Sequence, residues 1–274
     1  FVSFNEFDSW NEFVHKIVPA LQGRNYVVYH PGLLQTKDVQ SFAQDSDVQQ
    51  AAFHIQRVID EIEKDPTESS VGGYSVSGLP LLCVGHSNGA STLASLVALC
   101  PEVAKGIDGL LLLSPYADLR EASTLAHVSR VSSLVAGFGA KLFFAPKYSP
   151  TKKSPEMYVK AGLFPESLPT LFVNNRNDHV VPFRNRHLFA LAFDSHQKYE
   201  QTVRFLDLDT GGHNWGWRRV RLLCEHCGDG TAHTHGTFDQ KMASKVRKYR
   251  YYLRSDDREA FQKAINEFLD HKVL

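Results

Sequence analysis

The stretch Leu81-Leu82-Cys83-Val84-Gly85-His86-Ser87-Asn88-Gly89-Ala90 decides how the rest of the chain is interpreted. A short apolar run leads into a glycine-bounded turn, and apolar residues with helical spacing follow it. A strand that turns this sharply into a helix needs very small residues two positions before and two positions after the serine. Gly85 and Gly89 occupy those two positions. The pattern predicts that Ser87 adopts a strained backbone conformation and that its hydroxyl projects above the sheet.

Apolar runs alternate with amphipathic stretches on both sides of this turn, which predicts an α/β fold. Most of the runs are almost continuously apolar, as in parallel strands that are covered on both faces. We therefore expect a mostly parallel sheet flanked by helices. The expected strands are 26–29, 81–85, 109–113, 170–173 and 203–208. The expected helices cover the apolar stripes at 53–62, 93–99, 188–192 and 261–269.

One long segment, between Pro115 and Pro169, has no strand character. A segment of this length inside a compact domain usually has a function or a structure of its own. We interpret residues 117–168 as a small helical cap inserted into the domain. Residues 1–116 and 169–274 then form the core.

Composition excludes several classes of protein. The 274 residues are 43% hydrophobic, and 30 basic side chains balance 30 acidic ones, so global charge gives no attraction to nucleic acid or anionic lipid. No apolar run is long enough for a transmembrane segment, and four cysteines are too few for a disulfide scaffold. The composition favours a soluble protein of the cytoplasm and leaves its location and oligomeric state open.

Two later turns carry a resemblance to a known family. Asp178 begins the sequence Asp-His-Val-Val-Pro after an apolar run, and His213 ends the sequence Gly-Gly-His after the last such run. With Ser87 before them, these residues follow the chain order of the α/β-hydrolase superfamily, which the sequence resembles over most of its length as an order of elements. The resemblance implies a catalytic triad of Ser87, Asp178 and His213.

The chemistry of these side chains agrees with that role. A serine hydroxyl needs an adjacent base to attack a carbonyl, and a histidine can accept its proton and return it to the leaving group. A buried carboxylate orients the histidine, and the backbone amide of Asn88 is placed to stabilise the oxyanion. We predict a serine hydrolase that cleaves a carboxylic ester through an acyl-enzyme and requires no cofactor. Thioester or amide cleavage would use the same groups, and the alternative is a non-catalytic protein of this fold that binds a ligand or partner.

Two other aspartates are alternative candidates for the catalytic acid. Asp207 and Asp209 are close to His213 in the sequence, but they belong to the expected strand 203–208 or its end, so we rank them below Asp178.

The second oxyanion donor has two candidate places. His30-Pro31-Gly32 follows the expected strand 26–29. In the interpretation that we favour, Phe1-Val2 ends the strand that carries this donor, Ser3-Phe4-Asn5 replaces the family's usual His-Gly-Phe, and the backbone N–H of Phe4 is the donor. That interpretation implies that the family's first two strands and most of its third are absent from this chain.

Two further stretches suggest binding. Cys224, Cys227, His233 and His235 could ligate a structural zinc ion, although the gap between the two pairs is shorter than in common zinc fingers, and an ordinary polar loop is the leading alternative. Residues 241–254 are basic with interleaved tyrosines, where nucleic-acid contact is conceivable but a solvated helix face is the favoured interpretation.

Overall fold

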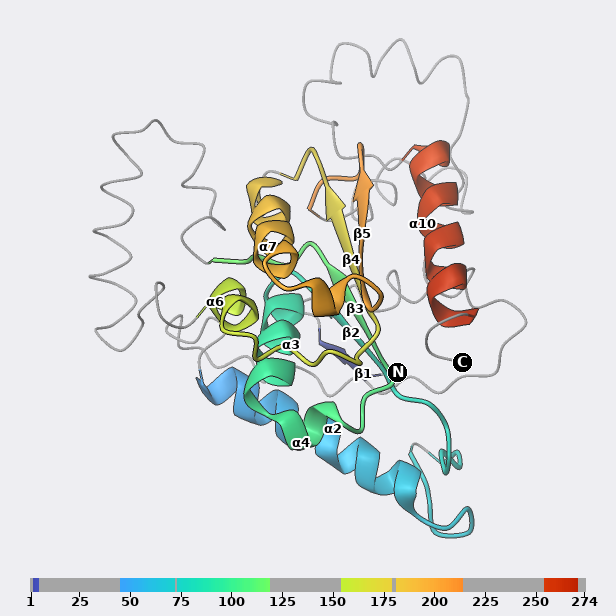
Figure 1. The fold of residues 1–274 in the computed structure, drawn as a ribbon. Helices are drawn as coiled ribbons and strands as arrows, with labels where there is room; N and C mark the ends of the chain where they lie inside the picture. Colours follow the sequence, from blue (N-terminus) through green and yellow to red (C-terminus); the bar gives the residue numbers. More distant parts are fainter. Residues whose placement is uncertain are drawn as a thin grey trace.

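The structure is a computed structural model, and it describes residues 2–4, 45–71, 73–118, 154–178, 181–213 and 254–270 (Figure 1). Five strands form one sheet in the order β1-β2-β3-β4-β5, and all four pairings are parallel. The strands are β1 (Val2–Phe4), β2 (Leu82–His86), β3 (Gly109–Leu113), β4 (Thr170–Asn175) and β5 (Val203–Leu208). The predicted parallel sheet is therefore confirmed. The strand expected at 26–29 lies outside the described residues.

The expected helices are confirmed, and each begins four to eight residues before its predicted apolar stripe. They are α2 (Asp45–Glu63), α3 (Asn88–Leu99), α7 (Arg184–Asp194) and α10 (Ser255–Phe268). Three shorter helices join them: α4 (Pro101–Ala104), α6 (Pro155–Lys160) and the 3₁₀ helix η3 (Gln197–Tyr199).

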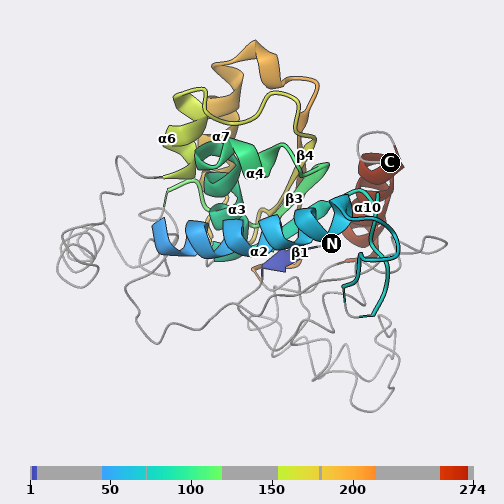
Figure 2. The same cartoon turned by 90° about the horizontal axis from the view of Figure 1, so that it is seen from below.

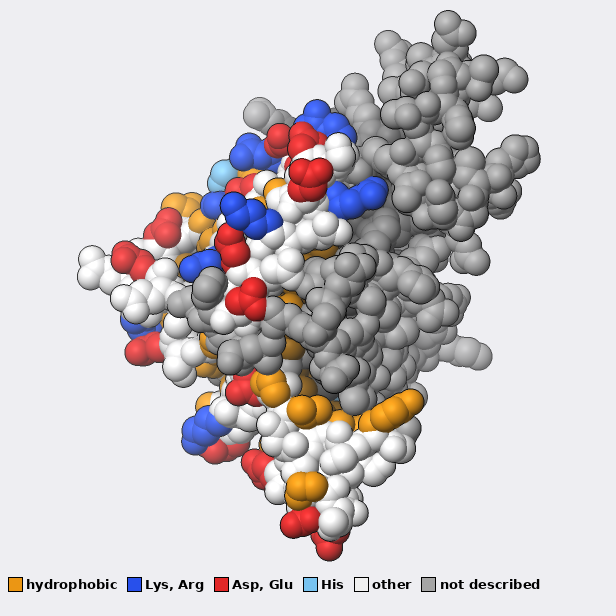
Figure 3. All heavy atoms as spheres, turned by 90° about the vertical axis from the view of Figure 1, so that its right-hand side faces the viewer, with side chains coloured by type: hydrophobic (Ala, Val, Ile, Leu, Met, Phe, Trp, Pro, Cys, Tyr) orange, Lys and Arg blue, Asp and Glu red, His pale blue; other side chains and the backbone are white. Residues whose placement is uncertain are grey.

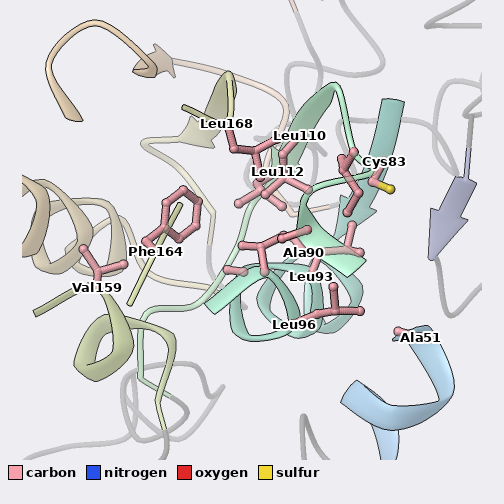
Figure 4. Close-up of a cluster of buried hydrophobic side chains, with 14 of the residues drawn as sticks. Ala51, Cys83, Ala90, Leu93, Leu96, Leu110, Leu112, Val159, Phe164 and Leu168 are labelled. Carbon is pink, nitrogen blue, oxygen red and sulfur yellow. The ribbon is translucent and has the colours of Figure 1, made fainter. Parts of the chain in front are cut away.

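Most of these helices pack against one face of the sheet. Figure 4 shows part of the apolar cluster on that face. The apolar side of α3, including Leu93 and Leu96, packs against the side chains of Cys83, Leu110 and Leu112 that point to this face. Helices α2 and α7 extend the same cluster, and so do residues of the segment around α6. The cluster on this face contains most of the buried apolar side chains among the described residues.

Helix α10 covers the opposite face (Figures 1 and 2). Its Phe261, Ile265 and Phe268 pack against Leu111 and Val173 in a second cluster. Successive side chains of a strand point to opposite faces, so strands covered on both sides must be apolar throughout. That requirement explains why the burial of β2, β3 and β4 is continuous rather than alternating.

The division into core and cap stays a prediction, because residues 119–153 lie outside the described part of the chain. The described end of the proposed cap, from Ser154 to Leu168, contributes Val159, Phe164 and Leu168 to the large cluster. That end is joined to the core by apolar packing.

The described surface has no segregated charge on the face shown in Figure 3, where acidic and basic side chains are intermixed. Within the described residues, no helix is both long enough and apolar enough to span a membrane.

Candidate active site

The turn after β2 has the strained geometry expected for an exposed nucleophile. Ser87 has φ 53° and ψ −119°, and Ser87 and Ser114 are the two non-glycine residues with positive φ in the described part of the chain. Such conformations cost about 1–3 kcal/mol and persist where the surrounding structure holds them. Hydrogen bonds hold this one, since the Ser87 N–H donates to Leu113 O at 2.9 Å and Ser87 O accepts from Ser91 N–H at 3.1 Å. Ser87 as a residue is only partly buried.

Gly85 explains why the turn requires a glycine. A Cβ placed on Gly85 would lie 2.6 Å from Ala90 Cα and 2.7 Å from Ala90 N. Both are backbone atoms of α3, which cannot move aside as a flexible side chain could. The close approach of β2 and α3 is therefore possible only with glycine at this position.

The N-terminus of α3 provides donors for a developing negative charge. Its first turn closes with the bond from Ser91 N–H to Ser87 O, and the amides of Asn88 and Gly89 come before that bond. Amides in the first turn of a helix have no acceptor within the helix and carry the positive end of its dipole. The Asn88 amide predicted for the oxyanion belongs to this set.

His213 and Asp178 lie together, as the sequence predicts. His213 Nδ1 donates to Asp178 Oδ2 at 2.9 Å, and both side chains are buried. The other carboxylate oxygen, Asp178 Oδ1, accepts from Val181 N–H at 2.8 Å. In a neutral imidazole, a proton on Nδ1 leaves Nε2 unprotonated, which is the form that a general base requires.

His86 connects the histidine loop to the turn at Ser87. His86 is the last residue of β2, and its Nε2 donates to His213 O at 2.8 Å. The centroids of the two imidazole rings lie 4.9 Å apart. Burial, with a smaller contribution from His213, lowers the pKa of His86 to about 3. His86 is therefore neutral near pH 7. No local sequence pattern indicates the hydrogen bond between His86 and His213.

The two rival acids pair elsewhere. Asp207 accepts from Arg186 of α7, whose Nε lies 3.0 Å from Asp207 Oδ2. Asp209 Oδ1 lies 3.2 Å from Arg176 Nε. Asp178 is thus the carboxylate that the described structure brings to His213. The catalytic roles of Ser87, Asp178 and His213 remain predictions.

Comparisons with known proteins were made on this geometry. No protein-family model matches the chain, and no curated protein matches it. Solved structures do. A sugar hydrolase from Lactococcus lactis matches with a TM-score of 0.55 at 13% identity, over 98% of this chain and 87% of that one. An esterase of Pyrococcus furiosus matches with a TM-score of 0.54 at 12% identity, over 100% of this chain and 80% of that one.

An acylaminoacyl peptidase of Pyrococcus horikoshii matches with a TM-score of 0.50 at 12% identity, over 86% of this chain and 29% of that one. All three have the same architecture. The chain has the α/β-hydrolase fold. At these identities the likeness establishes the fold, and the activities in those names belong to those proteins.

Strand β1 is the neighbour of β2 in the sheet. It pairs in parallel with β2, with Phe4 opposite Gly85, so its end lies beside the turn at Ser87. Ser3 and Phe4 belong to β1, so the strand extends two residues beyond the end at Val2 that the sequence predicted. The role of the Phe4 amide stays a prediction, and His30-Pro31-Gly32 lies outside the described residues.

Other candidates also lie outside the described part of the chain. They are the proposed zinc ligands Cys224, Cys227, His233 and His235 and most of the basic stretch 241–254. Among the residues that are described, no cluster of three or more His, Cys, Asp or Glu could hold a metal ion. Cys83 is no competing nucleophile, because burial raises the pKa of its thiol to about 12.

Tyr116 is a residue of the site that the sequence did not predict. Its hydroxyl donates to Asn88 Oδ1 at 2.7 Å, and its backbone N–H donates to Ser91 Oγ at 2.9 Å. Tyr116 thus holds the first turn of α3 from the loop after β3. A tyrosine three residues beyond an apolar strand is an ordinary sequence feature, so nothing in the pattern marked it.

Proposed function

We propose that this protein is a serine hydrolase that cleaves a carboxylic ester. The observation that carries the proposal is the buried 2.9 Å bond between His213 Nδ1 and Asp178 Oδ2, in a loop that also contacts His86, the neighbour of Ser87. The strained conformation of Ser87 agrees with it. The α/β-hydrolase fold supports the proposal because solved relatives in that fold are named as an esterase and a peptidase.

The reaction follows from the roles of the three side chains. Ser87 Oγ attacks the ester carbonyl while His213 Nε2 takes the hydroxyl proton, and Asp178 stabilises the imidazolium. The oxyanion of the tetrahedral intermediate accepts hydrogen bonds from the Asn88 amide and, in this proposal, from the Phe4 amide. Collapse of the intermediate breaks the ester C–O bond, and His213 gives its proton to the departing alcohol.

The acyl-enzyme is then hydrolysed by the same groups. His213 removes a proton from water, the hydroxide attacks the acyl carbonyl, and the proton returns to Ser87 as the acid leaves. No cofactor enters either half of this reaction. Thioesters and amides could enter the same cycle, since only the leaving group differs.

The test compares the hydrolysis of p-nitrophenyl acetate and butyrate, a matched thioester and a matched anilide by the wild type and Ser87→Ala. We expect the wild type to turn over at least one ester, and we expect Ser87→Ala to be slower by about 10³-fold or more. Ser95→Ala is the matched control, because it removes a hydroxyl from the same helix about two turns later. Equal turnover in Ser87→Ala and the wild type would contradict the proposal.

A further inference from the structure

The loop that carries His213 has a backbone that needs external support. Gly211 has φ 109° and Gly212 has φ 56°, so two consecutive residues take conformations that side-chain-bearing residues rarely adopt. Glycine permits these conformations but does not enforce them, because its backbone is the least restricted of all residues. The position of the His213 ring therefore depends on what binds this loop.

Two asparagines bind the loop at Gly212: Asn175, the last residue of β4, and Asn177, in the turn after it. Asn175 Nδ2 donates to Gly212 O at 2.9 Å, and Asn177 Oδ1 accepts from Gly212 N–H at 2.8 Å. One bond holds the peptide group before the Gly212 Cα, and the other holds the peptide group after it. The next carbonyl along the chain, that of His213, is the one held by His86.

The same turn also carries the acid. Asp178 directly follows Asn177 and binds the His213 ring, so one short turn contacts both the backbone and the imidazole of the histidine loop. The ring and its carboxylate partner are thereby fixed to a common support. A shift of about 1 Å in such a pair can cost about 10²-fold in rate.

We propose that Asn175 and Asn177 are positioning residues that hold His213 in line with Asp178. The expected effect of these residues on catalysis rests on the proposed function. The claim that they hold the His213 loop in place does not. Asn175 is 1% exposed, and its Oδ1 has no hydrogen-bond partner in the described part of the chain. A half-satisfied buried amide is unfavourable as plain packing, and the bond to Gly212 O gives the reason for an amide there.

The chain offers a matched control in the neighbouring residue. Asn174 lies one position earlier in β4, is 4% exposed, and points to the opposite face of the sheet because side chains alternate along a strand. Its Nδ2 has no partner within the described residues. Asn174→Ala and Asn175→Ala thus delete equal amides from similarly buried places. Among the described residues, Asn175→Ala alone of the two removes a bond to the histidine loop.

The experiment combines kinetics with a proton NMR signal that needs no activity. The His213 Nδ1 proton, held by a buried carboxylate, gives a far-downfield resonance that is assigned by its loss in His213→Ala. We expect Asn175→Ala and Asn177→Ala to lower kcat by about 10- to 100-fold with KM within twofold, and to broaden or abolish this resonance. Asn174→Ala should keep both kcat and the resonance.

Further variants keep the test decisive. Asn177→Asp retains an oxygen acceptor for Gly212 N–H, so it should recover most of the kcat that Asn177→Ala loses. Asn177 is only partly buried, so Asn177→Ala decides the matter if Asn175→Ala does not fold. Wild-type kcat and an unchanged resonance in Asn177→Ala would overturn the proposal. If the wild type proves inactive, the proposed function fails, and the resonance alone still tests the positioning role.

Discussion

At the scale of single residues, the approach of β2 to α3 depends on Gly85. A methyl group there would overlap backbone atoms of Ala90, so the strand and helix would have to separate. Overpacking of this kind typically costs about 1–3 kcal/mol. We expect Gly85→Ala to lower the free energy of unfolding by at least that amount, measured by urea denaturation, and to abolish any activity that needs Ser87.

Gly106 provides the control for this prediction. A Cβ at Gly106 would lie 2.6 Å from Ile59 Cδ1 and 2.9 Å from Ile59 Cγ1, which are side-chain atoms rather than backbone atoms. Gly106→Ala should therefore be accommodated at lower cost than Gly85→Ala. An equal loss of stability in the two variants would mean that the backbone contact at Gly85 has no special role.

The assignment of the acid is also decided at the residue scale. Asp178→Asn keeps the shape of the side chain but removes the charge that stabilises an imidazolium, and it favours the wrong tautomer of His213. We expect kcat to fall by about 10³- to 10⁴-fold, measured on the best ester substrate.

Asp207→Asn is the counterpart, since Asp207 pairs with Arg186 and not with His213. This pair is partly exposed, so its loss should cost about 1 kcal/mol or less and leave kcat within a few-fold. If Asp207→Asn lost activity and Asp178→Asn did not, the acid would be misassigned.

At the scale of elements, α10 covers the second face of the sheet. Its Phe261 is 3% exposed and packs among the apolar side chains of that face. Its Asp257 accepts from the backbone N–H groups of Asp209 and Thr210, so the helix also holds the start of the histidine loop. Deleting a buried phenylalanine side chain usually costs about 3–5 kcal/mol.

We therefore expect Phe261→Ala to lower the free energy of unfolding by about that amount, measured by urea denaturation. Glu259→Ala, an exposed position on the same helix, should change it by less than about 0.5 kcal/mol. A stability loss below about 1 kcal/mol in Phe261→Ala would mean that α10 contributes little to the folded state.

The elements were predictable because each carries a local signal. Strands buried on both faces are mostly apolar, and the helices bury one stripe, so periodicity located β2 to β5 and the four longer helices. Strand β1 was expected only from the family resemblance. The ends of these elements were predicted less accurately. Strand β4 continues through the polar Asn174 and Asn175, two residues beyond the expected end, because their pairing with β5 persists where the apolar run stops.

The site was predictable to the extent that its chemistry lies in short motifs. The turn at Ser87, the acid turn and the Gly-Gly-His sequence identified three side chains, and the structure brings Asp178 and His213 together. His86, Tyr116 and the asparagine at 175 contact residues far away in the sequence. No local pattern encodes such contacts, so the sequence could not reveal them.

At the scale of the whole molecule, stability should depend on pH through His86. Burial keeps the pKa of His86 at about 3 in the folded protein, below its ordinary value of 6.5. Between these two values the unfolded chain binds a proton that the folded protein does not, so stability rises with pH. The contribution is complete above about pH 6.5 and is lost as the pH falls toward 3, by about 1.4 kcal/mol per pH unit.

The variant His86→Gln removes the titrating group and keeps an amide that can donate to His213 O. We expect its free energy of unfolding, measured by urea denaturation between pH 4.5 and pH 7, to fall less steeply with acidification than that of the wild type. The two slopes should differ by about one bound proton. Identical slopes would show that His86 is protonated in the folded protein or that its burial is not retained.

The central claim is that Ser87 is activated by His213, and intact mass after treatment with a fluorophosphonate tests it most directly. The reagent phosphonylates an activated serine, so the expected result is one adduct on the wild type and none on Ser87→Ala or His213→Ala. Ser95→Ala should form the adduct as the wild type does. A folded wild type that forms no adduct, or an adduct that persists in Ser87→Ala, would contradict the account.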